Sequence, residues 1–214
     1  MSKFRAVIFD MDGVIVDSEP RHERAFFEVI EEIGYGNRHG VVFSEYVGRT
    51  DTDLWKDFVA RNKPEQPLEE LLVRKRLKVL DILLRDEPLF PGLYELVRTL
   101  AQTHVLGLAS GSERCIVDAV LGLRDLRQFF KATMSGSDIT HGKPAPDIFL
   151  KTATQLGVAP GDCVVIEDSK PGIAAGLAAG MTVIAITNTH SGQELANAHH
   201  VVSSYDEIGR LLAG

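Results

Sequence analysis

The sequence predicts an α/β protein with a doubly wound parallel sheet and an inserted α-helical domain. Short, unbroken apolar runs alternate with helical patterns of about ten residues, which is typical of parallel strands joined by crossover helices. Residues 17–87 break this alternation, because they hold helical patterns and no convincing strand. We therefore expect residues 1–16 and 88–214 to form the α/β core and residues 17–87 to form the helical insert.

The strands are predicted from continuous apolar segments, as expected where both faces of a sheet are buried. The first run, Ala6-Val7-Ile8-Phe9, ends abruptly in Asp10-Met11-Asp12-Gly13. A two-residue run at 201–202 is a weaker strand candidate. The other expected strands are 105–109, 163–166 and 182–186.

The helices are predicted from apolar residues spaced three and four apart. In the core, such stripes lie within 93–100, 116–121 and 149–156, and Ser112 is placed to cap the second of these helices. In the insert, the stripes are 26–33 and 68–83, and Lys75 and Arg76 interrupt the latter.

Composition excludes several classes of protein. With 214 residues, 44% hydrophobic and 25% charged, the chain is an ordinary globular protein of one domain plus an insert. A net charge of −7 argues against a nucleic acid or an anionic membrane surface as partner. Cys115 and Cys163 cannot form a disulfide framework; we expect both to be small buried side chains in a reducing, cytoplasmic compartment.

Polar side chains follow the predicted strands, where ligands bind in open parallel sheets. Asp10 and Asp12 follow the first run, Ser110 and Gly111 the second, and Glu167 and Asp168 the third. Four acids at one edge raise one another's pKa values unless a cation lies among them. Mg²⁺ suits such a site, because it is usually held by carboxylates, water and phosphate oxygens. Lys143 comes just before a predicted helix start, where it could balance the negative charge of a phosphoryl group.

These residues resemble the motifs of the haloacid dehalogenase-like hydrolases. The first motif is Asp10-Met11-Asp12-Gly13-Val14, the second ends in Ser110, the third is Lys143-Pro144, and the fourth is Glu167-Asp168 with Gly172. The helical insert and the Gly-Lys-Pro-x-Pro-Asp run resemble the branch that contains β-phosphoglucomutase and phosphoglycolate phosphatase. The four motifs occur in order and span nearly the whole chain. Their combination is specific, and it implies a Rossmann-like core with a cap domain.

The resemblance also implies roles for these residues. Asp10 would attack phosphorus and form an aspartyl-phosphate, and Asp12 would serve as general acid and then as general base. Ser110, Gly111 and Lys143 would bind the phosphoryl oxygens. Mg²⁺ would be held by the side chains of Asp10 and Asp168 and the backbone carbonyl of Asp12, with Glu167 beside or behind them.

In the insert, the resemblance points to substrate-contacting residues. His22 and Arg49 resemble positions where this branch places substrate-contacting residues, and Lys75 resembles part of a basic pair on the last long helix of the cap. Basic residues on an exposed helix are usually only solvated. The mutase carries an arginine in the loop after the cap glycine. Here Arg49 follows Gly48 immediately, and this departure from the mutase pattern favours a phosphatase.

We therefore expect a magnesium-dependent phosphatase that hydrolyses a small phosphorylated metabolite, of the sugar phosphate or phosphoglycolate type. A phosphomutase of the β-phosphoglucomutase type is the alternative, and a non-catalytic module that binds a phosphorylated ligand is a further one. No nucleic acid or membrane is expected as partner. The sequence does not define the oligomeric state, and a monomer is compatible with it.

Overall fold

The computed structural model describes residues 4–46 and 51–213. The chain divides into two compact units, one formed by residues 1–17 with 88–214 and the other by residues 18–87. Within the described residues, no helix combines the length and the apolar character that crossing a membrane requires.

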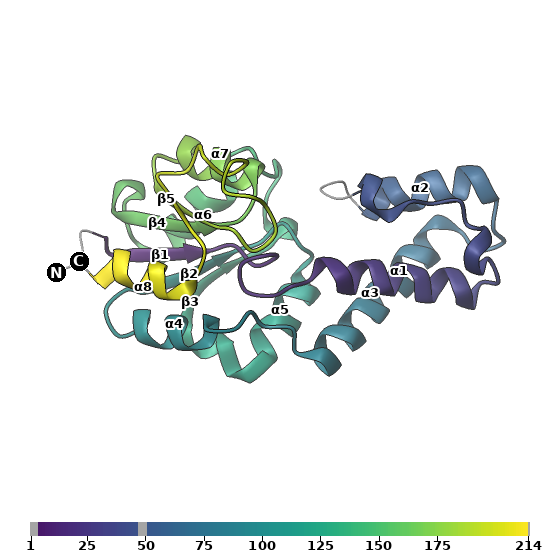
Figure 1. Cartoon of the computed structure of the whole chain (residues 1–214), viewed down its shortest axis with the longest axis horizontal. Coiled ribbons are helices and arrows are strands. Elements are labelled where there is room, and N and C mark those ends of the chain that lie inside the picture. Colours follow the sequence, from purple (N-terminus) through teal and green to yellow (C-terminus); the bar gives the residue numbers. More distant parts are fainter. Residues whose placement is uncertain (1–3, 47–50, 214) are drawn as a thin grey trace. The chain divides into compact units, whose positions relative to one another are not determined.

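The first unit is built on a six-stranded parallel sheet in the order β3-β2-β1-β4-β5-β6 (Figure 1). This order reverses direction between β1 and β4, as in doubly wound folds. β1 lies at the centre, where Phe9 pairs with Leu108 on one side and Ile166 on the other. The strands are β1 (Ala6–Phe9), β2 (Val105–Ala109), β3 (Phe130–Met134), β4 (Cys163–Glu167), β5 (Thr182–Ile186) and β6 (His200–Val202).

Helices cover both faces of the sheet. The helices α6 (Asp147–Leu156) and α7 (Lys170–Ala178) lie on one face. The other face carries α4 (Leu93–Leu100), α5 (Arg114–Gly122) and α8 (Tyr205–Ala213) (Figure 1). Short 3₁₀ helices complete the chain: η1 (Gly36–Arg38), η2 (Phe43–Tyr46), η3 (Leu123–Phe129), η4 (Gly136–Asp138) and η5 (Pro160–Asp162).

The second unit consists of α1 (Glu19–Glu32), α2 (Asp51–Asn62) and α3 (Leu68–Asp86), with η1 and η2 between the first two. Its core is aromatic: the rings of Phe26 and Trp55 lie 4.8 Å apart, and those of Trp55 and Phe58 lie 5.5 Å apart. All three are fully buried. Aromatic side chains of this size give a small unit a large buried apolar area for few residues.

The predicted fold class is confirmed, and so are the strands at 6–9, 105–109, 163–166 and 182–186. The weaker candidate at 201–202 is part of β6. The edge strand β3 and the helices α2 and α8 were not expected. One residue was also assigned wrongly: Cys163 is buried as expected, but Cys115 is exposed. It lies in the first turn of α5, where the buried face of the helix is formed by Ile116 and Val117.

Candidate active site

The predicted site residues of the core meet at the carboxyl ends of β1, β2 and β4. Asp10 follows β1 directly, and its backbone N–H donates to the carbonyl of Ile166 at 2.9 Å. Asp168 follows β4, and Ser110 follows β2. This is the point at which the strand order reverses, where open α/β sheets bind their ligands.

Three buried carboxyl groups form the acidic part of the site. Asp10, Glu167 and Asp168 are 6%, 0% and 5% exposed, and each offers an oxygen within 4.8 Å of the others. Burial raises the pKa of Asp10 well above its usual value; Lys143 opposes this shift, and the neighbouring acids add to it. Burial and the charge of Glu167 raise the pKa of Asp168 to about 6. Burial is therefore the main cause of both raised pKa values, and the neighbouring acids add to it.

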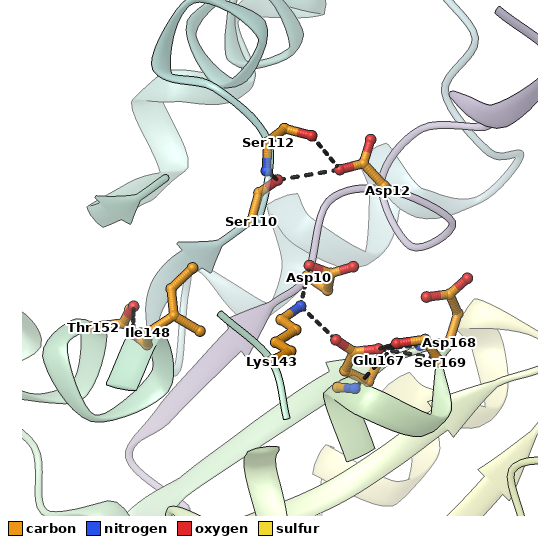
Figure 2. A network of polar contacts seen from close by, with 11 residues as sticks. Asp10, Asp12, Ser110, Ser112, Lys143, Ile148, Thr152, Glu167, Asp168 and Ser169 are labelled. Atoms are coloured by element: carbon orange, nitrogen blue, oxygen red, sulfur yellow. Dashed lines mark hydrogen bonds and ion pairs between the residues drawn. The ribbon is translucent and has the colours of Figure 1, made fainter. Parts of the chain in front are cut away.

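Lys143 lies between two of these acids (Figure 2). Its Nζ donates to Asp10 Oδ1 at 2.6 Å and to Glu167 Oε1 at 2.5 Å. Burial disfavours its charge, but Asp10 and Glu167 more than compensate and raise the pKa of Lys143 above its ordinary value. The Lys143 ammonium group also lies 5.1 Å from the centre of the Phe149 ring. The lysine is thus charged and fixed beside the Asp10 carboxylate.

Glu167 is held from several sides, which limits what it can bind. Its Oε2 accepts hydrogen bonds from the backbone N–H of Asp168 and of Ser169, at 2.9 and 3.0 Å, and from the Ser169 hydroxyl at 2.8 Å. Gly172 lies against the same side chain, because a Cβ atom there would overlap the Glu167 carboxyl group. Glu167 is therefore a rigid anchor for Lys143 and for the start of α7.

Asp12 lies in the loop after β1 and faces two serine hydroxyls (Figure 2). Asp12 Oδ2 accepts from Ser112 Oγ at 2.8 Å and from Ser110 Oγ at 3.2 Å. The expectation that Ser112 caps a helix is wrong. Glu113 holds the N-cap position of α5 without a side-chain hydrogen bond, because the Ser112 hydroxyl is directed to Asp12 instead.

Three residues of the site were not predicted from the sequence. The Thr189 hydroxyl donates to Asp168 Oδ2. Asn188 Nδ2 donates to the carbonyl of Gly13 at 2.8 Å, and the Tyr205 hydroxyl donates to the carbonyl of Val14 at 2.6 Å. Thr189 and Asn188 follow β5, so reading the residues after that strand as well would have found them.

Gly13 lets the loop after β1 approach Asp168 closely. Its φ of +78° is left-handed, and a Cβ atom there would overlap the Asp168 carboxyl group and press against Thr189. Hard carboxylate oxygens, gathered in excess over the one lysine beside them, are the donor set that divalent cations such as Mg²⁺ prefer. The residues present therefore fit a hard divalent metal ion.

In the helical unit, two of the three predicted substrate residues are in contact. Lys75 is not on an exposed face: its side chain is 1% exposed, its Nζ donates to the Asp51 carboxylate, and it lies 2.9 Å from His22 Nδ1. The buried lysine is tolerated inside the unit because a carboxylate balances its charge. Arg49 lies outside the described residues.

Comparison with known proteins agrees with this architecture. The model of the haloacid dehalogenase-like hydrolase family matches residues 4–180. Hexitol phosphatase B of Escherichia coli K12 is 35% identical over 185 residues, which cover 85% of this chain and 82% of the relative. Fructose-1-phosphate phosphatase YqaB of the same organism is 33% identical over 186 residues, covering 85% and 96%.

A solved structure shows the same fold. The β-phosphoglucomutase of Clostridium difficile superposes with a TM-score of 0.76 over 96% of this chain and 93% of that chain, at 24% identity. At this level of identity the likeness concerns the fold alone. The family match spans most of the sequence, and the chain belongs to the haloacid dehalogenase-like hydrolases.

Proposed function

We propose that the protein is a magnesium-dependent phosphatase that hydrolyses small phosphorylated sugars or polyols through an aspartyl-phosphate on Asp10. The observation that carries this proposal is the arrangement of Asp10, Lys143 and Asp168 around one point at the sheet edge. A carboxylate nucleophile there has a fixed positive charge on one side and an incomplete set of hard oxygen ligands on the other. Phosphoryl transfer depends mainly on such positioning and charge stabilisation.

In the first step, an oxygen of the Asp10 carboxylate attacks phosphorus, and the bond from phosphorus to the ester oxygen breaks. Asp12 gives its proton to the departing alcohol oxygen. In the second step, Asp12 takes a proton from a water molecule that attacks phosphorus, and the Asp10 carboxylate leaves. The sum is one ester and one water converted to one alcohol and one phosphate, with both acids restored.

Lys143, Ser110 and the backbone of Gly111 would bind the phosphoryl oxygens. Lys143 is already charged and immobile, so little reorganisation is needed when negative charge develops there. Gly111 is exposed, and a Cβ atom there would have no atom within 4 Å, so the segment has room for a ligand beside its backbone N–H.

Asp10, Asp168 and the backbone carbonyl of Asp12 would hold Mg²⁺. When bound, the ion supplies the positive charge that the acidic cluster lacks and stabilises phosphoryl oxygens during transfer. Glu167 would stand behind these ligands, because its oxygens are occupied by Lys143, two backbone N–H groups and the Ser169 hydroxyl. Thr189 would orient Asp168 by its hydrogen bond, as partners of metal ligands commonly do.

The helical unit would serve as a cap that selects among substrates, with His22 and Lys75 as contributors and Arg49 as a third. Phosphatase is favoured over phosphomutase because the two curated relatives given above are named as sugar and hexitol phosphatases. The protein is expected to act on free metabolites in the cytoplasm.

The test is phosphate release from a panel of hexitol phosphates, fructose 1-phosphate, glucose 6-phosphate and phosphoglycolate, with Mg²⁺ and with EDTA. We expect turnover of at least one sugar or hexitol phosphate with Mg²⁺ and none with EDTA. Isomerisation of β-glucose 1-phosphate with little free phosphate would instead identify a mutase. Absence of metal-dependent turnover on the panel and on p-nitrophenyl phosphate would contradict the phosphatase proposal and favour a non-catalytic module that binds phosphorylated ligands.

Asp10→Asn is the matched variant for the same assay. It removes the nucleophilic oxygen and keeps the size of the side chain, so we expect turnover to fall by on the order of 10³-fold or more while the fold survives. Circular dichroism checks the fold. Phosphatase activity retained in this variant would exclude Asp10 as the nucleophile.

A further inference from the structure

Ser112 is held in place as firmly as the site residues, although no catalytic motif includes it. Its carbonyl accepts from the backbone N–H of Gly136 at 2.9 Å, and its own N–H donates to Ser110 Oγ at 3.0 Å. A Cβ atom at Gly136 would overlap the carbonyl of Gly111, so the two loops are in close contact. The backbone that carries the Ser112 hydroxyl is therefore fixed to the loop after β3.

The hydroxyl of Ser112 is used in an unexpected way. A serine just before a helix ordinarily accepts a hydrogen bond from the first helical turn. Here α5 begins without any side-chain cap, and Ser112 Oγ donates to Asp12 Oδ2 at 2.8 Å. The Ser112 hydroxyl therefore serves the loop after β1 and not the first turn of α5.

Asp12 needs such a partner because of its place in the chain. It lies half-buried in the loop after β1, and the terminal torsion of an aspartate side chain is broad. Both serine hydroxyls donate to the same oxygen, Asp12 Oδ2, and the Ser112 contact is shorter than the Ser110 contact by 0.4 Å. Ser112 therefore sets the direction of the Asp12 carboxyl group.

We propose that Ser112 is a positioning residue that aims Asp12 at the leaving-group oxygen during the first chemical step. The proposal rests on the function proposed above. In that step the ester oxygen departs from phosphorus with the bonding electron pair and takes a proton from Asp12. Ser112 neither gains nor loses a proton overall; its hydroxyl only keeps one oxygen of Asp12 in place.

This role predicts a dependence on the leaving group. An alkoxide from a sugar phosphate is a strong base and departs slowly without a proton. The p-nitrophenolate ion is a weak base and departs without one. A disordered Asp12 should therefore impair kcat/KM for a sugar phosphate, and hardly change it for p-nitrophenyl phosphate, since kcat/KM reports the steps up to release of the alcohol.

The experiment compares Ser112→Ala, Ser112→Thr and the wild type on fructose 1-phosphate, or the best ester of the panel, and on p-nitrophenyl phosphate. Ser203→Ala is the matched control, because Ser203 Oγ also donates to a carboxylate, Glu207, at 2.9 Å on an exposed surface. For Ser112→Ala we expect about 10- to 100-fold lower kcat/KM on the sugar ester. On the aryl ester we expect a change below about threefold. Ser112→Thr keeps the hydroxyl and should restore the wild-type ratio of kcat/KM on the sugar ester to kcat/KM on the aryl ester.

Two results would overturn the proposal. Equal losses on both esters would mean that Ser112 contacts the phosphoryl group or supports the fold. No loss on either ester would mean that its hydroxyl is unimportant for Asp12. Failure of the proposed function is seen separately, in the wild type, as absence of magnesium-dependent hydrolysis of both esters.

Discussion

Each of the two units holds a lysine beside carboxylates, and the two clusters differ in how far these carboxylates are exposed to water. Lys143 stands among Asp10, Glu167 and Asp168, all nearly inaccessible to water. Lys75 is itself buried, but the side chain of its partner Asp51 is 46% exposed. The first cluster has an excess of acid that water cannot hydrate, whereas in the second water hydrates the carboxylate partner.

The comparison shows how buried charge can distinguish a reactive centre from a local ion pair. At the sheet edge, burial raises the pKa values of Asp10 and Asp168, and the neighbouring acids add to both shifts. A bound cation would favour the ionised carboxylates, and a phosphoryl group could then bind between that cation and Lys143. In the helical unit, Lys75 contacts the Asp51 carboxylate, which remains in contact with solvent.

Removal of each lysine should give the largest difference in stability between the two clusters. Lys143→Met would leave Glu167 buried without its counter-charge, and we expect a loss of about 3–5 kcal/mol in the free energy of unfolding at neutral pH without metal. Lys75→Met would leave a carboxylate that water can reach, so we expect a change within about 1 kcal/mol.

Urea unfolding followed by circular dichroism measures the first variant, and the fluorescence of Trp55, the single tryptophan, reports on the helical unit. Similar losses in both variants would show that the two clusters do not differ in the way described.

The acidic cluster of the first unit should also make the stability of the protein depend on pH. Because the pKa of Asp168 is raised to about 6, the native protein without metal keeps a proton that the unfolded chain releases near pH 4. Its free energy of unfolding should therefore fall as the pH rises from about 4 to 6, by at most about 3 kcal/mol.

Asp168→Asn in EDTA isolates this contribution, since the variant should lose that part of the decline. Mg²⁺ should oppose the decline in the wild type, because the cation favours the ionised carboxylates. A wild type and variant with parallel pH profiles in EDTA would show that Asp168 is ionised throughout this range.

Substitution of Gly172, which packs on Glu167, should have a smaller effect on the free energy of unfolding. Gly172→Ala should lower the free energy of unfolding by about 1–3 kcal/mol, because the added methyl group overlaps a carboxyl group that is fixed on several sides. Gly122→Ala is the control: it has open space and a helical φ of −73°, so we expect a gain of up to about 1 kcal/mol. Urea unfolding measures both variants, and a Gly172→Ala protein as stable as the control would show that Glu167 can move aside.

Much of the fold could be predicted because central parallel strands are apolar on both faces. The segments that became β1, β2, β4 and β5 are continuous runs for this reason. β3 was not predicted because it is an edge strand, and the exposed Lys131 interrupts its apolar pattern. α2 was not predicted because only Leu54, Trp55 and Phe58 of its twelve residues are buried, which leaves a weak helical stripe.

The site was predictable to the extent that strand ends define it. Asp10, Ser110 and Asp168 follow strands whose apolar pattern is plain, and Glu167 ends one of them, so their convergence could be expected. The link between Ser112 and Asp12 joins residues 100 positions apart, and a serine before a helix looks like a cap. Likewise, Lys75 looks like an interruption of an apolar stripe until its partner from another helix is known.

The central claim is that Asp10 carries the phosphoryl group. The direct measurement is to quench the enzyme during turnover of a sugar phosphate with Mg²⁺, reduce acyl phosphates with borohydride, and map the peptides by mass spectrometry. The account predicts conversion of Asp10 to homoserine in the wild type and no conversion at this position in Asp10→Asn. Steady phosphate release with Asp10 unmodified, or modification of a different residue, would contradict it.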